Sequence, residues 1–231
     1  HLDAAELERR SAAALAAYDL AAAELSAQRR AAAEVLDRRV SDLMQDLGLR
    51  GGVFRTRIDP ATAPARTENG ADEIEFLVSA NPGQPPRPLA KTASGGELSR
   101  ISLALQVATL DATHLPCLVF DEVDAGVGGA VAEMVGRQLR TLAASGQVLC
   151  VTHLAQVAAQ ADRQVRVSKR SVGGRTQTRL EPLDGAARID ELARMLAGAN
   201  VTETAREHAR EMLEAARPAP RRRVSASAGG S

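Results

Sequence analysis

The stretch Cys117-Leu118-Val119-Phe120-Asp121-Glu122 takes an apolar run directly into two adjacent carboxylates. A short apolar run of this kind is typical of a strand buried in a parallel β-sheet. Ligands of open α/β sheets bind just beyond the carboxyl ends of such strands. Asp121 could therefore hold Mg²⁺, directly or through water, and Glu122 could orient or deprotonate an attacking water. The alternative is a solvated acidic strand end, which the buried run before it disfavours.

A second apolar run, at 147–152, ends next to His153. Residues 129–144, between the two runs, have the pattern of a helix, and the order strand, helix, strand predicts a βαβ unit. His153 should then emerge at the same edge of the sheet as Asp121 and Glu122. A lone histidine at a strand end is more often structural than catalytic, and these expected neighbours favour a functional role.

The segment Ser94-Gly95-Gly96-Glu97-Leu98-Ser99-Arg100 predicts the start of a helix. Ser94 and Glu97 have the spacing of a capping box. The two glycines between them would leave backbone N–H groups bare at the positive end of the helix, which suits a phosphate. An ordinary capped helix after a loop explains the same residues, and the segment alone does not separate the two readings.

The chain divides into three parts. Residues 1–48 contain no proline and no glycine before Gly48, and they predict one long helix. Its apolar residues form a heptad-like stripe at Leu15, Tyr18, Ala22, Leu25, Ala32, Leu36, Leu43 and Leu47. One strand of a coiled coil explains this stripe, and so does an ordinary amphipathic helix packed on its own domain.

Residues 49–216 are predicted to form an α/β domain, and residues 217–231, rich in Pro, Arg, Ser, Ala and Gly, a disordered tail. The further elements expected in the domain are strands at 53–58 and 74–79, a helix at 96–111, a strand at 115–120, a hairpin of 163–169 and 175–181, and a helical stretch at 188–215 with a break near Gly198.

Composition excludes several classes of function. The 231 residues carry 29 basic and 29 acidic side chains, which argues against a strongly basic fold that coats nucleic acid. Aromatic residues make up 2%, too few for base stacking as a main activity. Cys117 and Cys150 are too few for a disulfide framework and are expected to be buried thiols. No apolar run approaches the length of a membrane span, and no signal peptide is visible.

In this order, the motifs resemble the C-terminal lobe of an ATP-binding-cassette (ABC) ATPase head. Residues 117–122 look like the Walker B strand with its following glutamate, and His153 looks like the switch histidine. The remaining matches are the signature at Ser94, Gly95, Gly96 and Glu97, and the D-loop at Asp124, Ala125 and Gly126.

Longer stretches narrow the resemblance to one family. SGGELSRISLALQV, VFDEVDAGVGG and QVLCVTHLAQVAAQAD are similar to sequences of the RecN family, bacterial SMC-like ATPases of DNA repair. The resemblance covers about residues 1–214. It implies an α/β fold, namely the C-terminal lobe of an ABC/SMC-type P-loop ATPase head, with a mostly parallel sheet and flanking helices, preceded by a long coiled-coil helix.

The resemblance also implies ligands and partners. Two heads would dimerise around two ATP molecules with Mg²⁺, so that the head forms a homodimer that acts on DNA in double-strand-break repair and recombination. Asp121 would support Mg²⁺, Glu122 would act as general base and His153 would contact the γ-phosphate. Residues 94–97 would reach ATP held by the opposite head. The family resemblance implies a cytoplasmic, nucleoid-associated protein with no membrane partner.

One motif is missing. A P-loop needs Gly, four residues, Gly, Lys and Ser or Thr, but Lys91-Thr92 has Ala90 and Pro85 where the two glycines would stand. ATP and Mg²⁺ would therefore require an N-terminal lobe as partner, and the chain alone is predicted to be inactive. Two alternatives stay open: another ABC ATPase such as a transporter subunit, in which Gln usually replaces Glu97, and a non-hydrolysing coiled-coil scaffold.

Overall fold

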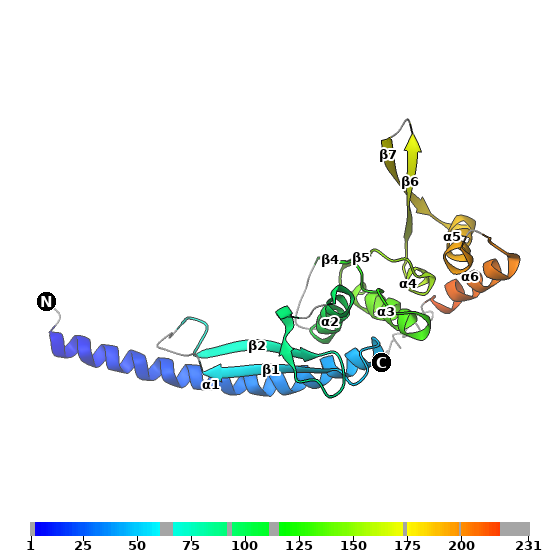
Figure 1. Cartoon of the computed structure of the whole chain (residues 1–231). Helices are drawn as coiled ribbons and strands as arrows, with labels where there is room; N and C mark the ends of the chain where they lie inside the picture. Colours follow the sequence, from blue (N-terminus) through cyan, green and yellow to red (C-terminus); the bar gives the residue numbers. More distant parts are fainter. Residues whose placement is uncertain are drawn as a thin grey trace, which may run out of the picture.

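The structure is a computed structural model that describes residues 3–60, 67–91, 94–110, 116–172, 175–198 and 200–217. The molecule is elongated, with helix α1 (Ala4–Asp46) carrying the N-terminus far from the other elements (Figure 1). The other elements are β1 (Val53–Pro60), β2 (Asp72–Ser79), β3 (Arg87–Pro88), the 3₁₀ helix η1 (Leu89–Lys91), α2 (Gly95–Ala108), β4 (Cys117–Phe120), α3 (Gly129–Leu142), β5 (Gln147–Cys150), α4 (Ala155–Ala159), β6 (Gln164–Val172), β7 (Arg175–Leu183), α5 (Gly185–Ala197) and α6 (Glu203–Ala215).

The described strands form three sheets, and the predicted α/β class is confirmed. Strands β1, β2 and β3 form an antiparallel sheet, β6 and β7 an antiparallel hairpin, and β4 and β5 a parallel pair. The strands and helices predicted from the sequence are present, apart from end positions of one to four residues. The short elements β3, η1 and α4 were not predicted.

Helix α1 packs along β1 through polar as well as apolar contacts. Asp37 accepts hydrogen bonds from the backbone N–H and the hydroxyl of Thr56, both at 2.8 Å. Farther along, Asp72 at the start of β2 accepts hydrogen bonds from the hydroxyl of Ser26 at 2.7 Å and from Arg29 at 2.9 Å. These contacts fasten the sheet to the helix between Ser26 and Asp37.

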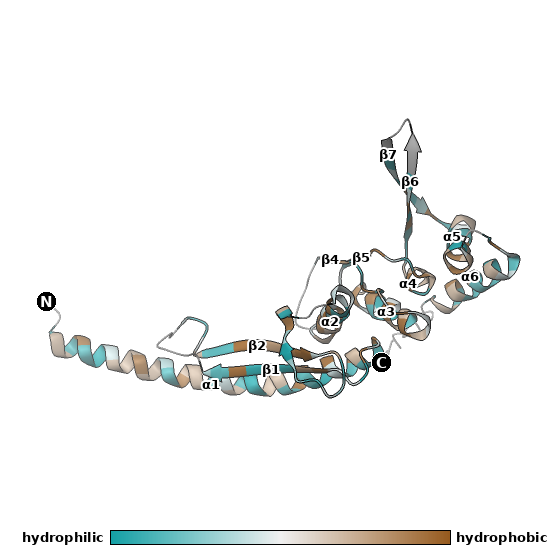
Figure 2. Cartoon of the chain, in the orientation of Figure 1, coloured by the Kyte–Doolittle hydropathy of each residue, from teal (hydrophilic) through white to brown (hydrophobic). Residues whose placement is uncertain are grey.

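The predicted apolar stripe of α1 is only partly the face that packs. Leu15 and Ala32 are exposed, whereas the polar Ser26 and Asp37 are buried. Hydrophilic and hydrophobic segments alternate along the helix (Figure 2). The reason is that the β-sheet offers hydrogen-bond partners to this face, so polar residues replace apolar ones there. From Ala22 on, the helix therefore packs on the described domain, and the coiled-coil interpretation of the stripe stays a prediction.

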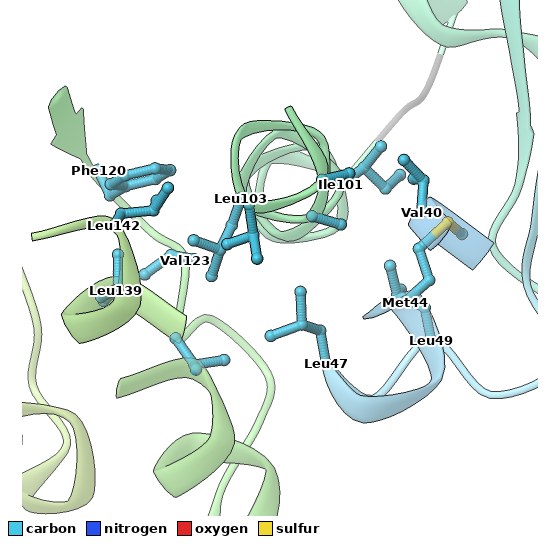
Figure 3. Close-up of a cluster of buried hydrophobic side chains, with 14 of the residues drawn as sticks. Val40, Met44, Leu47, Leu49, Ile101, Leu103, Phe120, Val123, Leu139 and Leu142 are labelled. Atoms are coloured by element: carbon cyan, nitrogen blue, oxygen red, sulfur yellow. The ribbon is translucent and has the colours of Figure 1, made fainter. Parts of the chain in front are cut away.

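The main core joins the end of α1 to α2, α3 and β4. Figure 3 shows Val40, Met44 and Leu47 facing Ile101 and Leu103 of α2, with Phe120, Val123, Leu139 and Leu142 behind them. Full burial of each such side chain stabilises a fold by about 1.5–3 kcal/mol relative to exposure. This core fixes the two segments that carry the candidate motifs, the start of α2 and the end of β4.

The two parallel strands are covered on one face only, which corrects the expectation that they are fully buried. Phe120 is 5% exposed, but Val119 is 68%, Leu149 51% and Val151 63% exposed. Cys117, predicted to be buried, is also exposed, because it alternates with Leu118 on the same side as Val119. The helices of the described chain pack against the other face, and nothing in the described chain covers this one.

The C-terminal part forms a second, smaller core. Helices α4, α5 and α6 bury Ala155, Leu192 and Ala209, and Gly198, with φ +74°, ends α5 where the break was predicted. The β6–β7 hairpin projects away from these helices (Figure 1). Within the described residues, every helix is too short or too polar to span a bilayer. The predicted disordered tail lies, from residue 218 on, outside the described residues.

Candidate functional site

Helix α2 begins as predicted. Ser94 is its N-cap, and the Ser94 hydroxyl accepts a hydrogen bond from the backbone N–H of Glu97 at 3.4 Å. Gly95 and Gly96 form the first turn, so their backbone N–H groups lie at the positive end of the helix dipole. The segment therefore has the capped start that both readings of the sequence require.

The first turns of α2 are joined to the turn after β4. The Ser99 hydroxyl donates to the carbonyl of Asp121 at 2.9 Å, and Arg100 Nη1 donates to the carbonyl of Ala125 at 2.7 Å. A Cβ on Gly96 would lie 3.0 Å from the Ala125 Cβ, so only glycine fits without displacement. The candidate signature and the segment after β4 thus form one packed unit.

Arg100 is a site residue that the sequence analysis did not single out. Its side chain is buried, and burial lowers the pKa of its guanidinium. A buried arginine normally needs strong hydrogen-bond partners, and here the Ala125 carbonyl is one. The available signal was its position: a charged residue one turn after the glycines, on the buried face of a helix.

The two adjacent carboxylates are exposed. Asp121 accepts the backbone N–H of Glu122 at 3.0 Å. Glu122 has φ +58°, the left-handed region, and it is the sole non-glycine residue of the described ranges with a positive φ. Such backbone conformations cost energy and concentrate at functional sites. A Cβ on Gly95 would lie 2.7 Å from Glu122 Oε2, so this carboxylate reaches over the start of α2.

The ends of β4 and β5 meet at one edge, as predicted. Phe120 pairs with Cys150, and the Val151 N–H bonds to the Phe120 carbonyl at 3.0 Å. Just beyond, the buried carboxylate of Asp124 lies 3.3 Å from Nδ1 of His153, whose side chain is 72% exposed. The structure therefore brings together the turn at Asp124 and the candidate switch histidine.

The electrostatics of this edge are negative. Burial raises the pKa of the Cys150 thiol to about 12, and the carboxylates of Asp124 and Asp121 add to that effect. Exposed carboxylate oxygens are hard ligands of the kind that Mg²⁺ prefers, and one carboxylate is enough where phosphates supply other ligands. Asp121 therefore fits the part of a magnesium ligand in a nucleotide site.

A hollow of about 250 Å³ adjoins the same edge. Leu98, Ser99 and Ser102 of α2 line it on one side, and Leu118, Val119 and Asp121 line it on the other. It thus runs from the start of α2 to the outer edge of β4, where Val119 is exposed. The candidate site is therefore open toward the uncovered side of the parallel strands.

Curated relatives match most of the chain. A DNA repair protein RecN from Xylella fastidiosa (strain Temecula1) is 46% identical over 209 residues, 90% of this chain and 38% of the relative. The RecN of Vibrio cholerae is 47% identical over 80% of this chain and 33% of its own length. The RecN of Streptomyces coelicolor is 54% identical over 64% of this chain and 26% of its own length. The chain thus spans between 26% and 38% of the length of these relatives.

No model of a known protein family matches the chain. Among solved structures, an Smc head domain with a coiled coil and joint, from Pyrococcus yayanosii, aligns with a TM-score of 0.51 and 24% identity. The alignment covers 69% of this chain and 28% of that one, and it supports the fold alone. The sequence relatives are more specific than the fold. By these relatives, the chain belongs to the RecN family of bacterial DNA-repair proteins over the part of it that they match.

Proposed function

We propose that this chain is the C-terminal part of the ATPase head of a RecN-type protein, and that it acts in double-strand-break repair and recombination. One observation carries the proposal. The parallel pair β4–β5 brings Asp121, Glu122 and His153 to one edge, and hydrogen bonds join that edge to the glycine-rich start of α2. Phosphoryl transfer depends mainly on such fixed positioning.

The roles follow from the chemistry of each group. Asp121 supports Mg²⁺, Glu122 orients or deprotonates the attacking water, and His153 contacts the γ-phosphate. The first turn of α2, beginning with the cap Ser94, presents backbone N–H groups to the γ-phosphate of ATP in the opposite head. Mg²⁺, when bound with ATP, neutralises charge on the phosphates.

The turn from Asp124 to Gly126 serves as the D-loop in this proposal. Gly126 has φ +73°, which lets the chain reverse tightly between β4 and α3. The Val127 N–H donates to the Asp124 carbonyl at 3.4 Å across this turn. A D-loop at this position lies next to the first turn of α2, so both meet the opposite head together.

The partner in the same head is an N-terminal lobe that supplies the Walker A motif. The uncovered apolar side chains of β4 and β5 support this proposal, because strands of parallel sheets are ordinarily covered on both faces. The β6–β7 hairpin is also uncovered on one face, where Val165 and Val167 lie opposite Pro182 and Leu180. Such apolar patches mark protein contacts.

ATP binding would close two heads into a homodimer, and hydrolysis would open them. The protein would act on DNA in the cytoplasm, at the nucleoid. The relatives from Xylella fastidiosa, Vibrio cholerae and Streptomyces coelicolor are all RecN proteins, which favours this function over that of a transporter subunit.

The test is ATP turnover while this chain is titrated with the separately made N-terminal lobe of the same protein. We expect turnover only on mixing, and its loss with Glu122→Gln, because the amide cannot act as a base. Glu133→Gln, at a half-buried glutamate of α3 that pairs with Arg137, is the matched control and should keep turnover. Two lobes that bind each other but show no turnover, with and without DNA, would contradict a split ATPase site and favour a non-hydrolysing scaffold.

A further inference from the structure

Asp124 is the most deeply buried of the acidic residues at the site, with 2% of its surface exposed. It lies in the turn after β4, yet its carboxylate points to the end of β5. Its Oδ2 accepts a hydrogen bond from the Thr152 hydroxyl at 2.5 Å and another from the backbone N–H of His153 at 3.1 Å. One carboxylate oxygen thus fixes the backbone on which the candidate switch histidine stands.

The same oxygen also meets the imidazole. His153 Nδ1 lies 3.3 Å from Asp124 Oδ2, whereas the side chain of His153 is 72% exposed. Nδ1 thus faces a buried carboxylate, and most of the ring faces outward. In a neutral imidazole, the hydrogen bond made by one nitrogen decides which nitrogen carries the proton. A carboxylate at Nδ1 keeps the proton there and turns Nε2 toward the opening of the site.

A buried carboxylate needs hydrogen-bond or ion-pair partners that compensate for its lost hydration. The partners of Asp124 therefore indicate its role. Another strongly buried carboxylate of the described residues, that of Glu191, has an arginine partner: Arg194 donates to it at 2.6 Å. Among the described residues, no arginine or lysine forms an ion pair with Asp124, and His153 is the residue that does. Asp124 is therefore arranged around the histidine and the backbone next to it.

We propose that Asp124 is a positioning residue, which orients the His153 ring by holding Nδ1 so that Nε2 points into the candidate site. The catalytic value of this orientation rests on the proposed function, in which His153 contacts the γ-phosphate. The orientation itself does not rest on the proposed function, because it is a property of this chain without nucleotide. An orienting carboxylate behind a histidine is a general way to fix its tautomer and direction.

The test is the tautomer of His153 in this chain, measured by two-bond ¹H–¹⁵N correlation of labelled imidazoles at alkaline pH, where they are neutral. His153→Gln identifies the signals among the four histidines. We expect the proton on Nδ1 in the wild type and in the control Thr152→Val, which removes one donor but keeps the carboxylate. Asp124→Ala, which removes the accepting oxygen, should lose this preference. A wild-type His153 with its proton on Nε2 overturns the proposal, and so does an unchanged tautomer in Asp124→Ala.

Turnover separates this proposal from the proposed function. In the two-lobe assay, Asp124→Ala should lower kcat at least about tenfold with little change in KM, as expected when a catalytic histidine loses its orienting partner. A wild type that has the expected tautomer but no turnover contradicts the ATPase role and leaves the positioning intact. A wild type that turns over, with kcat unchanged in Asp124→Ala, contradicts the positioning role in catalysis.

Discussion

The two β-regions of the molecule differ in how they are covered. On β1 and β2, Phe54 is fully buried, Val78 is 5% exposed, and polar side chains of α1 bind the strands directly. On β4 and just after β5, Val119 and Val151 are more than 60% exposed, although these strands are more apolar than β1 and β2. The first region is covered at Phe54 and Val78, although Ile74 and Phe76 farther back along β2 are 44% and 38% exposed. The second region has one whole face that nothing in the described chain covers.

This difference separates stability from function. The covered region holds α1 in place, and the bare region carries the candidate catalytic groups at its edge. An apolar side chain contributes to stability only where folding removes it from water. Substitutions in the first region should therefore be felt in the isolated chain, and substitutions on the bare face only in the presence of a partner.

The largest effect is expected at the centre of the covered region. Phe54→Ala should lower the free energy of unfolding by about 3–5 kcal/mol, because it leaves a cavity and removes the ring contact with Phe76. The measurement is urea denaturation of this chain. Val119→Ala is the control on the bare face, and its effect should stay within about 0.5 kcal/mol. Equal losses of unfolding free energy in the two variants would contradict the difference in burial between the two β-regions.

A smaller effect is expected where α2 meets the turn after β4. Gly96→Ala should cost about 1–3 kcal/mol, because the new Cβ would meet the backbone carbonyl of Ala125 at 3.1 Å. Gly95→Ala should cost less than about 1 kcal/mol, since the atom it meets is the movable end of Glu122. Thermal unfolding of both variants compares them, and a costlier Gly95 variant would argue against the packed unit.

The smallest effect is expected at Asp72, and it depends on pH. The hydrogen bonds from Ser26 and Arg29 lower the pKa of this carboxyl, so its stabilisation is present above its unfolded pKa, about 3.9, and is lost as the pH falls through the folded pKa. Asp72→Asn should cost about 1 kcal/mol at pH 7 and flatten the acid limb of the stability profile. The measurement is urea denaturation at several pH values. Asp59→Asn, at an exposed position on β1, should leave that limb unchanged, and an equal flattening in both variants would contradict this role.

Much of this architecture was predictable because its signals are local. The apolar run that ends in Asp121 and Glu122 predicts a strand followed by a turn, and the pair Ser94 and Glu97 predicts the start of a helix. Short elements were missed because the five residues of α4 and the two of β3 are too few for an apolar pattern to repeat. The prediction that the apolar stripe of α1 is its packed face was only partly right, because a sheet that offers hydrogen-bond partners can bury Ser26 and Asp37.

The candidate site was predicted less completely than the fold. The types of residue at the site, and their position at one edge of the parallel strands, could be predicted from the sequence and the order of the strands. The contact between Asp124 and His153 did not, because a turn residue shows no periodicity that would reveal where its side chain points. Nor could the burial of β4 be judged, since the sequence of a strand does not tell whether the chain itself covers both faces.

The two cysteines give the two faces of the parallel pair different chemical reactivity. Cys150 is partly buried, and its pKa of about 12 keeps the thiol protonated and unreactive at neutral pH. Cys117 is exposed at the start of the neighbouring strand, on the same side as Val119. An alkylating reagent would therefore label the bare face selectively, and a lobe that docks there would shield this single thiol. The Cys117 thiol can thus report, by its loss of labelling, when another lobe docks on the uncovered face, and no cysteine has to be introduced for this purpose.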